Sequence, residues 1–263
     1  MLFYFAARRF ERAVVFHPER EDTLWKMPEG GADVWFTGRS GERLHGWYVR
    51  AQKVETEQEA PTVIYFHGNG GNINTVGWLG EALSKRGFNV LLFDYRGYGR
   101  SQGSVRDERA IYEDADAAYD YVVGERGVRP GQLVLYGQSL GTTAATDLAS
   151  RRACGVLVLE SGLSSASDMA ALILPWVPAW VYRYGQNHFE SAKKLSQVSA
   201  PVFVAHGALD RTIPVEQGYK LYAAAREPKR LVIIEQAGHN DLISRGGKEY
   251  LDTLTEFIKM GVR

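Results

Sequence analysis

The sequence has little of what marks several classes of protein. It contains one cysteine, Cys154, so an internal disulfide is excluded and nothing indicates an oxidising compartment. Lys plus Arg and Asp plus Glu number 31 each, so the formal net charge is zero and no basic surface for nucleic acid is expected. No H-E-x-x-H or paired-cysteine pattern is present, so no metal site is predicted.

Long apolar runs are also missing. None approaches the ~20 residues that a membrane-spanning helix needs. The N-terminal run Leu2–Ala7 is short, and Arg8, Arg9 and Arg12 follow it, whereas a secretory signal places its charges first. We expect this segment to pack on the body as a capping helix. The alternative is a weak contact with a membrane surface, so the predicted location is the cytoplasm, either free or peripheral to a membrane.

Nucleotide-binding motifs are incomplete. Gly68-Asn69-Gly70 follows a predicted strand and Asp94 ends the next one, as in a dinucleotide site, but Ile73 stands where the third glycine belongs. No lysine follows these glycines, so a phosphate-binding Walker loop is absent as well. We therefore expect no organic cofactor.

An alternation of strands and helices fills most of the chain. Strands are predicted over 34–36, 44–49, 62–66, 89–93, 132–136, 156–159, 201–205 and 230–234, and helices over 78–86, 108–123, 142–149, 215–225 and 248–259. The first two strands are expected to pair antiparallel. The later strands are continuous apolar runs, typical of parallel strands covered on both faces. We predict an α/β fold in one domain, 1–263: a mostly parallel sheet of about eight strands with helices on both faces.

One segment, 163–198, interrupts this alternation after the sixth strand. It is rich in Leu and Trp, and Pro175 and Pro178 forbid one continuous helix. An apolar insertion at the edge of the sheet where ligands bind is typical of a small cap over a pocket, although ordinary packing onto the body would also account for it. Trp176 and Trp180 are the side chains expected to face that pocket.

A G-x-S-x-G pentapeptide, Gly137–Gly141, lies between a predicted strand and a predicted helix. In this position it predicts a nucleophile elbow, in which a tight turn holds the serine, Ser139, in a strained conformation and exposes its hydroxyl. The amide of Leu140 then begins the helix and points toward negative charge that develops on a substrate.

A serine nucleophile needs a base and an orienting acid. His239 follows the last predicted strand and Asp210 follows the strand before it, which gives the chain order Ser, Asp, His. Glu160 and Asp241 are the competing acids. Glu160 ends the strand after the elbow strand, whereas Asp241 is only two residues from His239 and would struggle to reach its ring.

Four blocks in order resemble the α/β-hydrolase fold serine hydrolases, in particular the small-cap branch of alpha/beta-hydrolase-domain proteins. They are His67 to Asn72, Asp94 to Gly99, Gly137 to Gly141 and Gly238 to Asn240. The resemblance implies Ser139 as nucleophile, His239 as base and then acid, and Asp210 as orienting carboxylate. It also implies the backbone amide of Asn69 as the second oxyanion donor beside Leu140.

From these residues we predict a serine hydrolase that cleaves carboxylic esters of short to medium acyl chains through an acyl-enzyme. Thioesters are the nearest alternative substrates, because some relatives in this branch remove protein-bound acyl chains. Amide or peptide cleavage and a non-catalytic scaffold are further alternatives. The expected partner is a small-molecule ester or thioester.

Overall fold

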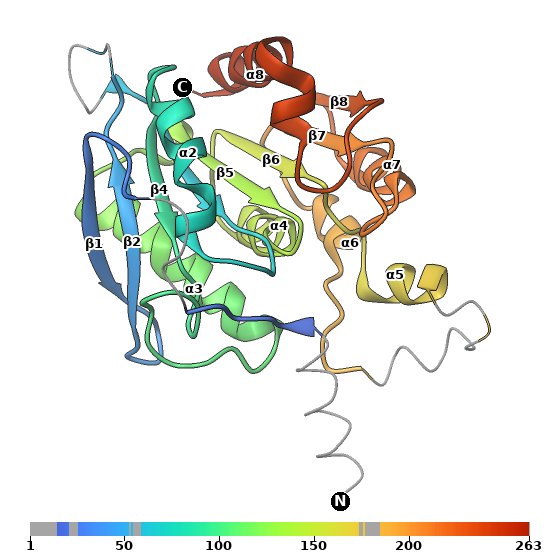
Figure 1. Cartoon of the computed structure of the whole chain (residues 1–263), viewed down its shortest axis with the longest axis horizontal. Helices are drawn as coiled ribbons and strands as arrows, with labels where there is room; N and C mark the ends of the chain where they lie inside the picture. The colour runs from blue at the N-terminus through green and yellow to red at the C-terminus, as the bar shows by residue number, and fades with distance from the viewer. Residues whose placement is uncertain are drawn as a thin grey trace, which may run out of the picture.

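An eight-stranded sheet forms the centre of the molecule (Figure 1). The structure is a computed structural model, and it describes residues 15–20, 26–52, 54, 59–173, 176 and 185–262. The strands run in the order β1-β2-β4-β3-β5-β6-β7-β8. β2 pairs antiparallel with both β1 and β4, and all later pairs are parallel. The strands are β1 Gly31–Thr37, β2 Arg43–Val49, β3 Thr62–Phe66, β4 Asn89–Phe93, β5 Leu133–Gln138, β6 Val156–Glu160, β7 Val202–Gly207 and β8 Lys229–Ile234.

Helices cover both faces of this sheet. They are α2 Ile73–Ser84, α3 Glu108–Asp120, α4 Gly141–Arg151, α5 Ala166–Ile173, α6 Ser191–Leu195, α7 Val215–Ala224 and α8 Leu242–Gly261, with short turns η2 Tyr121–Glu125 and η3 Pro130–Gln132. Alternate side chains of each inner strand enter separate cores. In β4, Leu91 and Phe93 pack with α3 and α4, whereas Val90 and Leu92 pack with α2 and α8. The predicted α/β fold with helices on both faces is therefore confirmed.

Two helices begin earlier than their apolar patterns predict. α2 begins at Ile73 because the Asn72 side chain accepts a hydrogen bond from the Asn74 amide, and Asp94 accepts one from the Ile73 amide at 2.9 Å. α8 begins at Leu242 and is kinked at Gly247, whose φ of 58° a residue with a side chain rarely adopts. In both cases the added turn borders the edge of the sheet where β3, β5 and β8 end.

Residues 16–20 lie across the loops that follow β3 and β4. Phe16 is buried against Phe189, with ring centroids 6.3 Å apart. The Glu19 carbonyl accepts a hydrogen bond from the Gly99 amide at 2.8 Å, and the Arg20 side chain donates to the Gly97 carbonyl at 3.2 Å. The Glu19 carbonyl also accepts a hydrogen bond from Asn72 Nδ2 at 3.4 Å, so this short segment contacts two of the four blocks. The predicted N-terminal capping helix, with Leu2–Ala7, lies outside the described residues.

The segment 163–198 contains α5 and α6 where the structure describes it. α6 packs against α4 and α7. Its middle, which includes Trp180, lies outside the described residues. Its role as a cap therefore stays a prediction.

Candidate active site

The turn between β5 and α4 is as tight as the pentapeptide predicts. Ser139 has φ 53°, in the left-handed region that L-residues rarely occupy. A Cβ on Gly137 would lie 2.5 Å from the Gly141 carbonyl oxygen, and one on Gly141 would overlap the Phe66 carbonyl group at the end of β3. Glycine is required at both positions because the turn brings three backbone segments into direct contact.

Gly141→Ala is expected to destabilise the protein by about 3 kcal/mol, since the added methyl group overlaps rigid backbone of a neighbouring strand. Gly124→Ala is the matched control, because a Cβ there meets nothing within 4 Å. Its free energy of unfolding should stay within about 1 kcal/mol of wild type. Urea unfolding of both variants measures the difference. Equal stabilities would show that the turn can relax.

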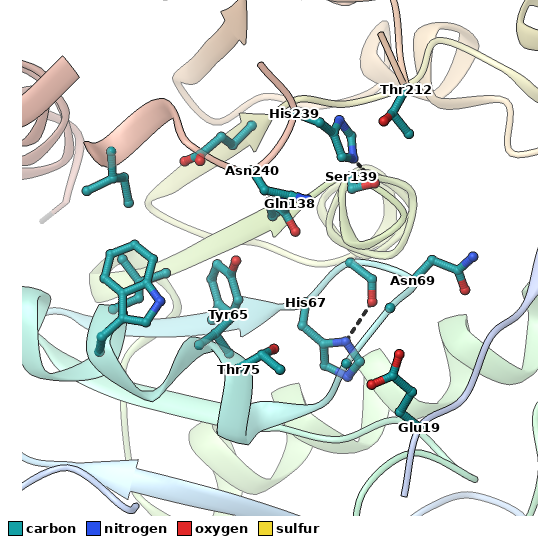
Figure 2. Close-up of a pocket in the computed structure, with 18 residues that line it drawn as sticks. Glu19, Tyr65, His67, Asn69, Thr75, Gln138, Ser139, Thr212, His239 and Asn240 are labelled. Atoms are coloured by element: carbon teal, nitrogen blue, oxygen red, sulfur yellow. Dashed lines mark hydrogen bonds between the residues drawn. The ribbon is translucent and has the colours of Figure 1, made fainter. Parts of the chain in front are cut away.

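Three side chains from three separate loops form a continuous hydrogen-bonded chain. His239 Nε2 lies 2.9 Å from Ser139 Oγ (Figure 2), and His239 Nδ1 lies 2.7 Å from Asp210 Oδ2. The serine follows β5, the aspartate follows β7 and the histidine follows β8. Because parallel strands end at the same edge of a sheet, residues up to 100 positions apart meet there. This arrangement can move a proton from a hydroxyl to an imidazole that a carboxylate orients.

Asp210 is held as an ionised acceptor. Its Oδ1 accepts the backbone amides of Thr212 and Ile213, each at 2.8 Å, and His206 Nε2 lies 3.3 Å from Oδ2. Burial alone would raise the pKa of Asp210, but the hydrogen bonds from His206, His239 and the Ile213 amide outweigh it and hold the pKa far below its ordinary value. The carboxylate therefore carries its charge at neutral pH.

Neither competing acid bonds the His239 ring. Glu160 Oε2 instead accepts hydrogen bonds from the Tyr136 and Tyr250 hydroxyls, the second at 3.1 Å. Asp241 accepts the Gly238 amide at 2.6 Å and the Arg245 side chain at 3.0 Å. Both carboxylates lie close to the histidine in sequence or space and are occupied by other partners.

The two amides expected to bind an oxyanion flank the serine. Among the described residues, neither the Leu140 nor the Asn69 backbone N–H donates a hydrogen bond to the protein. The loop that carries Asn69 approaches closely, since a Cβ on Gly68 would lie 3.3 Å from Ser139 Cβ. The Asn69 side chain is itself fixed, because Oδ1 accepts both the His17 amide and the Tyr98 hydroxyl at 3.0 Å.

Comparison with known proteins shows the family and the fold. The family described as serine aminopeptidase S33 matches residues 57–187. The protein Rv2307c of Mycobacterium tuberculosis is 36% identical, over 87% of this chain and 79% of its own. Alpha/beta hydrolase domain-containing protein 17B of Xenopus tropicalis is 30% identical, over 91% of this chain and 80% of its own. This chain belongs to the alpha/beta-hydrolase family. The Pyrococcus furiosus esterase Pf2001 shares the fold, with a TM-score of 0.74 at 20% identity over 95% of this chain and 98% of its own.

A cavity of about 580 Å³ opens beside Ser139 in this alpha/beta hydrolase. It extends between α2 and the beginning of α8. Apolar side chains at one end are Val76, Trp78, Leu79 and Ile243, and polar ones nearer the serine include Tyr65, Gln138, Glu160 and Asn240. Gln138 Nε2 donates to Asn240 Oδ1 at 3.1 Å and so links the serine loop to the histidine loop (Figure 2).

The tryptophans expected at the pocket do not supply its described lining. Trp176 is 75% exposed and is not among the residues that line the cavity, and Trp180 lies outside the described residues. The tryptophan that does line it is Trp78, on α2. The apolar side chains of α2 and α8 pack on one face of the sheet, whereas those of α4, α5 and α7 pack on the other face. The cavity lies between α2 and α8, and no described residue of α5 borders it.

Sequence reasoning also missed the second histidine at Asp210. His206 is not among the predicted site residues, yet its Nε2 lies 3.3 Å from Asp210 Oδ2 and 2.8 Å from the Ile213 carbonyl oxygen. The available signal was the spacing of four residues in His206-Gly207-Ala208-Leu209-Asp210, across a turn that folds back on the strand end.

Two features are absent from the described part of the hydrolase. No group of three or more His, Cys, Asp or Glu side chains there is placed to hold a metal ion. No described helix is long and apolar enough to cross a membrane.

Proposed function

We propose that this alpha/beta hydrolase is a serine esterase that cleaves carboxylic esters of short to medium acyl chains. The observation that carries the proposal is the continuous chain from Ser139 Oγ through His239 to Asp210 Oδ2. The esterase Pf2001 and an acetyl xylan esterase from Paenibacillus sp. R4 share the fold, which supports the reaction class by analogy.

In the proposed first step, Ser139 Oγ attacks the ester carbonyl and its proton passes to His239 Nε2. The carbonyl oxygen becomes an oxyanion that accepts hydrogen bonds from the Asn69 and Leu140 amides. When the intermediate collapses, the bond to the alcohol oxygen breaks and His239 donates its proton to the departing alcohol. The product is an acyl ester on Ser139.

In the second step, water attacks that acyl ester while His239 takes one of its protons. Collapse of the new oxyanion returns the proton to Ser139 Oγ and releases the carboxylic acid. Asp210 stays ionised throughout and stabilises the imidazolium that forms in each step. The enzyme requires no further reactant.

Thioesters are the second candidate substrates, because the same nucleophile and oxyanion donors serve them and their thiolate departs readily. The apolar end of the cavity, with Trp78 and Ile243, suits the acyl chain of either class. The amide alternative is less favoured, since an amine departs only after full protonation. The contact of residues 2–12 with a membrane surface and the cap role of 163–198 stay proposals from the sequence.

A chain-length series tests this function. We expect kcat/KM for p-nitrophenyl esters to be highest for butanoyl to octanoyl chains, because their apolar length matches the cavity, and about tenfold or more lower for palmitoyl. Matched thioesters, followed with a thiol reagent, decide between the two classes. A fluorophosphonate probe should modify wild type through Ser139 alone. A protein that neither reacts with the probe nor hydrolyses any ester would be a non-catalytic scaffold.

A further inference from the structure

Two polar side chains form the floor of the cavity, and the proposed acyl transfer uses neither. Tyr65 comes from β3 and Glu160 from β6, and both line the cavity although they are 97% and 93% buried (3% and 7% exposed). In Figure 2 the Tyr65 hydroxyl points toward Gln138, on the side of the cavity where Ser139 lies. We call these two residues the polar floor.

Each residue of the polar floor has an oxygen left over. Tyr136 and Tyr250 both donate to Glu160 Oε2, so that oxygen is occupied. Glu160 Oε1 and the Tyr65 hydroxyl have no hydrogen-bond partner among the described residues, and neither is among the fully enclosed unpaired atoms there. Two oxygens without a described protein partner therefore open to one cavity, where each can form a hydrogen bond to a bound group.

The charges around the cavity favour a cation. Its described lining residues include two carboxylates, Glu160 and the exposed Glu19, and among those residues there is no lysine or arginine. Burial raises the pKa of Glu160, while the tyrosine hydroxyls and nearby His239 act in the opposite direction. Burial outweighs them, so the net pKa of Glu160 is raised, and a cation beside Oε1 would favour the ionised carboxylate. Trp78 adds an aromatic face that cations also favour.

The polar floor lies close to the reacting atoms. The Ser139 amide donates to the Glu160 carbonyl at 2.9 Å, because Gln138 and Glu160 are partners in the β5–β6 ladder. The backbones of Glu160 and Ser139 are thus joined directly by a hydrogen bond. Ser139 and Glu160 also line the same cavity, so a group bound at Oε1 would share that cavity with an acyl chain on Ser139.

We propose that Glu160 and Tyr65 form a subsite for a primary ammonium group carried by the acyl part of the substrate. The preferred substrates are then esters of short amino acids rather than of plain fatty acids. This inference rests on the proposed esterase function, and it assigns to Glu160 a role in specificity rather than in the proton transfers.

The test compares p-nitrophenyl esters of β-alanine and of butanoic acid, which differ in an ammonium group against a methyl group. The ratio of their kcat/KM values is measured in wild type and in Glu160→Gln. The ratio of these ratios removes the difference in intrinsic reactivity between the esters. We expect the preference for the ammonium ester to fall about tenfold or more in Glu160→Gln, because a charge-assisted hydrogen bond is lost.

Two more variants and one more ester sharpen the result. Tyr65→Phe, which removes only a hydroxyl, should lower the same ratio about threefold or more. Glu19→Gln removes an exposed carboxylate of the same cavity and should change the ratio by less than about threefold, because water screens that charge. If Glu19→Gln and Glu160→Gln lowered the ratio equally, the subsite would be overturned, and the general negative potential of the cavity would account for the preference. If wild type preferred the 3-hydroxypropanoyl ester over the butanoyl ester as strongly as it prefers the β-alanine ester, the preference for a cation would be overturned.

A binding experiment separates failure of the subsite from failure of the esterase. In Ser139→Ala, butylammonium chloride is titrated against 1-butanol at constant ionic strength and followed by NMR shifts of residues at the cavity. We expect binding of butylammonium to weaken about fivefold or more when Glu160→Gln is added. Binding that depends on Glu160 without any ester turnover in wild type would sink the esterase and keep the subsite. Binding that Glu160→Gln leaves unaltered would sink the subsite alone.

Discussion

Ser139→Ala is expected to lower kcat/KM for p-nitrophenyl butanoate about 10⁵-fold while the fold is retained. The alanine removes the oxygen that lies 2.9 Å from His239 Nε2, and no other described hydroxyl makes that contact. In serine hydrolases the loss of the nucleophile removes nearly all of the rate enhancement. The oxyanion donors and substrate binding still accelerate hydrolysis about 10³-fold over the reaction in water. Steady-state kinetics and labelling by a fluorophosphonate probe provide the measurement.

The control for this variant is Ser161→Ala. Ser161 is also buried and also has a positive φ, 49°, but its hydroxyl donates to the His239 carbonyl at 3.1 Å rather than to the ring. We expect a loss of about tenfold or less and full labelling of Ser139, since only one hydrogen bond behind the histidine is removed. Activity of Ser139→Ala close to wild type would contradict the whole assignment.

Asp210→Asn is expected to lower kcat about 10⁴-fold with little change in KM. The carboxylate accepts from His239 Nδ1 at 2.7 Å and thereby keeps Nε2 free to take the serine proton. An asparagine that presents its amide nitrogen to Nδ1 would favour the wrong tautomer and could not stabilise the imidazolium. The loss should appear in kcat because the contact strengthens when the histidine becomes charged.

Glu160→Gln is the comparison that decides which acid orients the histidine. Its carboxylate bonds Tyr136 and Tyr250, so turnover of the butanoyl ester should fall less than about tenfold. If Glu160→Gln were more damaging than Asp210→Asn for that neutral ester, the acid would be misassigned. Both variants are measured with the same ester, because the ammonium ester tests the polar floor instead.

Asp210 also predicts a difference in acid stability. Its pKa is lowered on folding, so its stabilising contribution is complete above the ordinary aspartate pKa of about 4 and is lost as the pH falls below it. The free energy of unfolding of wild type should therefore fall more steeply below pH 4 than that of Asp210→Asn. Urea unfolding at pH 7 and at pH 3.5 compares the two proteins. Parallel curves would mean that the carboxylate gains no net stabilisation in the folded state.

The sequence predicts a structural feature well where a short stretch of residues determines it. The glycines around Ser139 are needed because neighbouring backbone leaves no room for a Cβ, and such a constraint is visible in five residues. The parallel sheet follows from strands that are apolar on both faces, and the sheet edge then brings His239 and Asp210 beside the serine. The three side chains therefore lie together at the strand ends, and their catalytic roles stay a prediction.

The direction of the cavity could not be predicted in the same way. It depends on which face of the sheet each crossover helix covers, and therefore on whether Tyr65 and Trp78 or the segment 163–198 meets the serine. The role of Glu160 depends on hydroxyls from β5 and α8, which are 24 residues before it and 90 residues after it. Single-sequence patterns contain no signal for such distant pairs.

The distance along the chain between Ser139 and His239 affects the protein while it is being made. A ribosome adds about 5–20 residues per second, starting from the N-terminus. Because His239 lies 100 residues after Ser139, the nascent chain contains the serine for several seconds before the histidine is added. During those seconds the hydroxyl lacks the base that the proposed mechanism requires, so the unfinished polypeptide is expected to react only slowly with esters. Under the proposed mechanism, Ser139 is expected to become reactive only after β8 and His239 have been added to the chain.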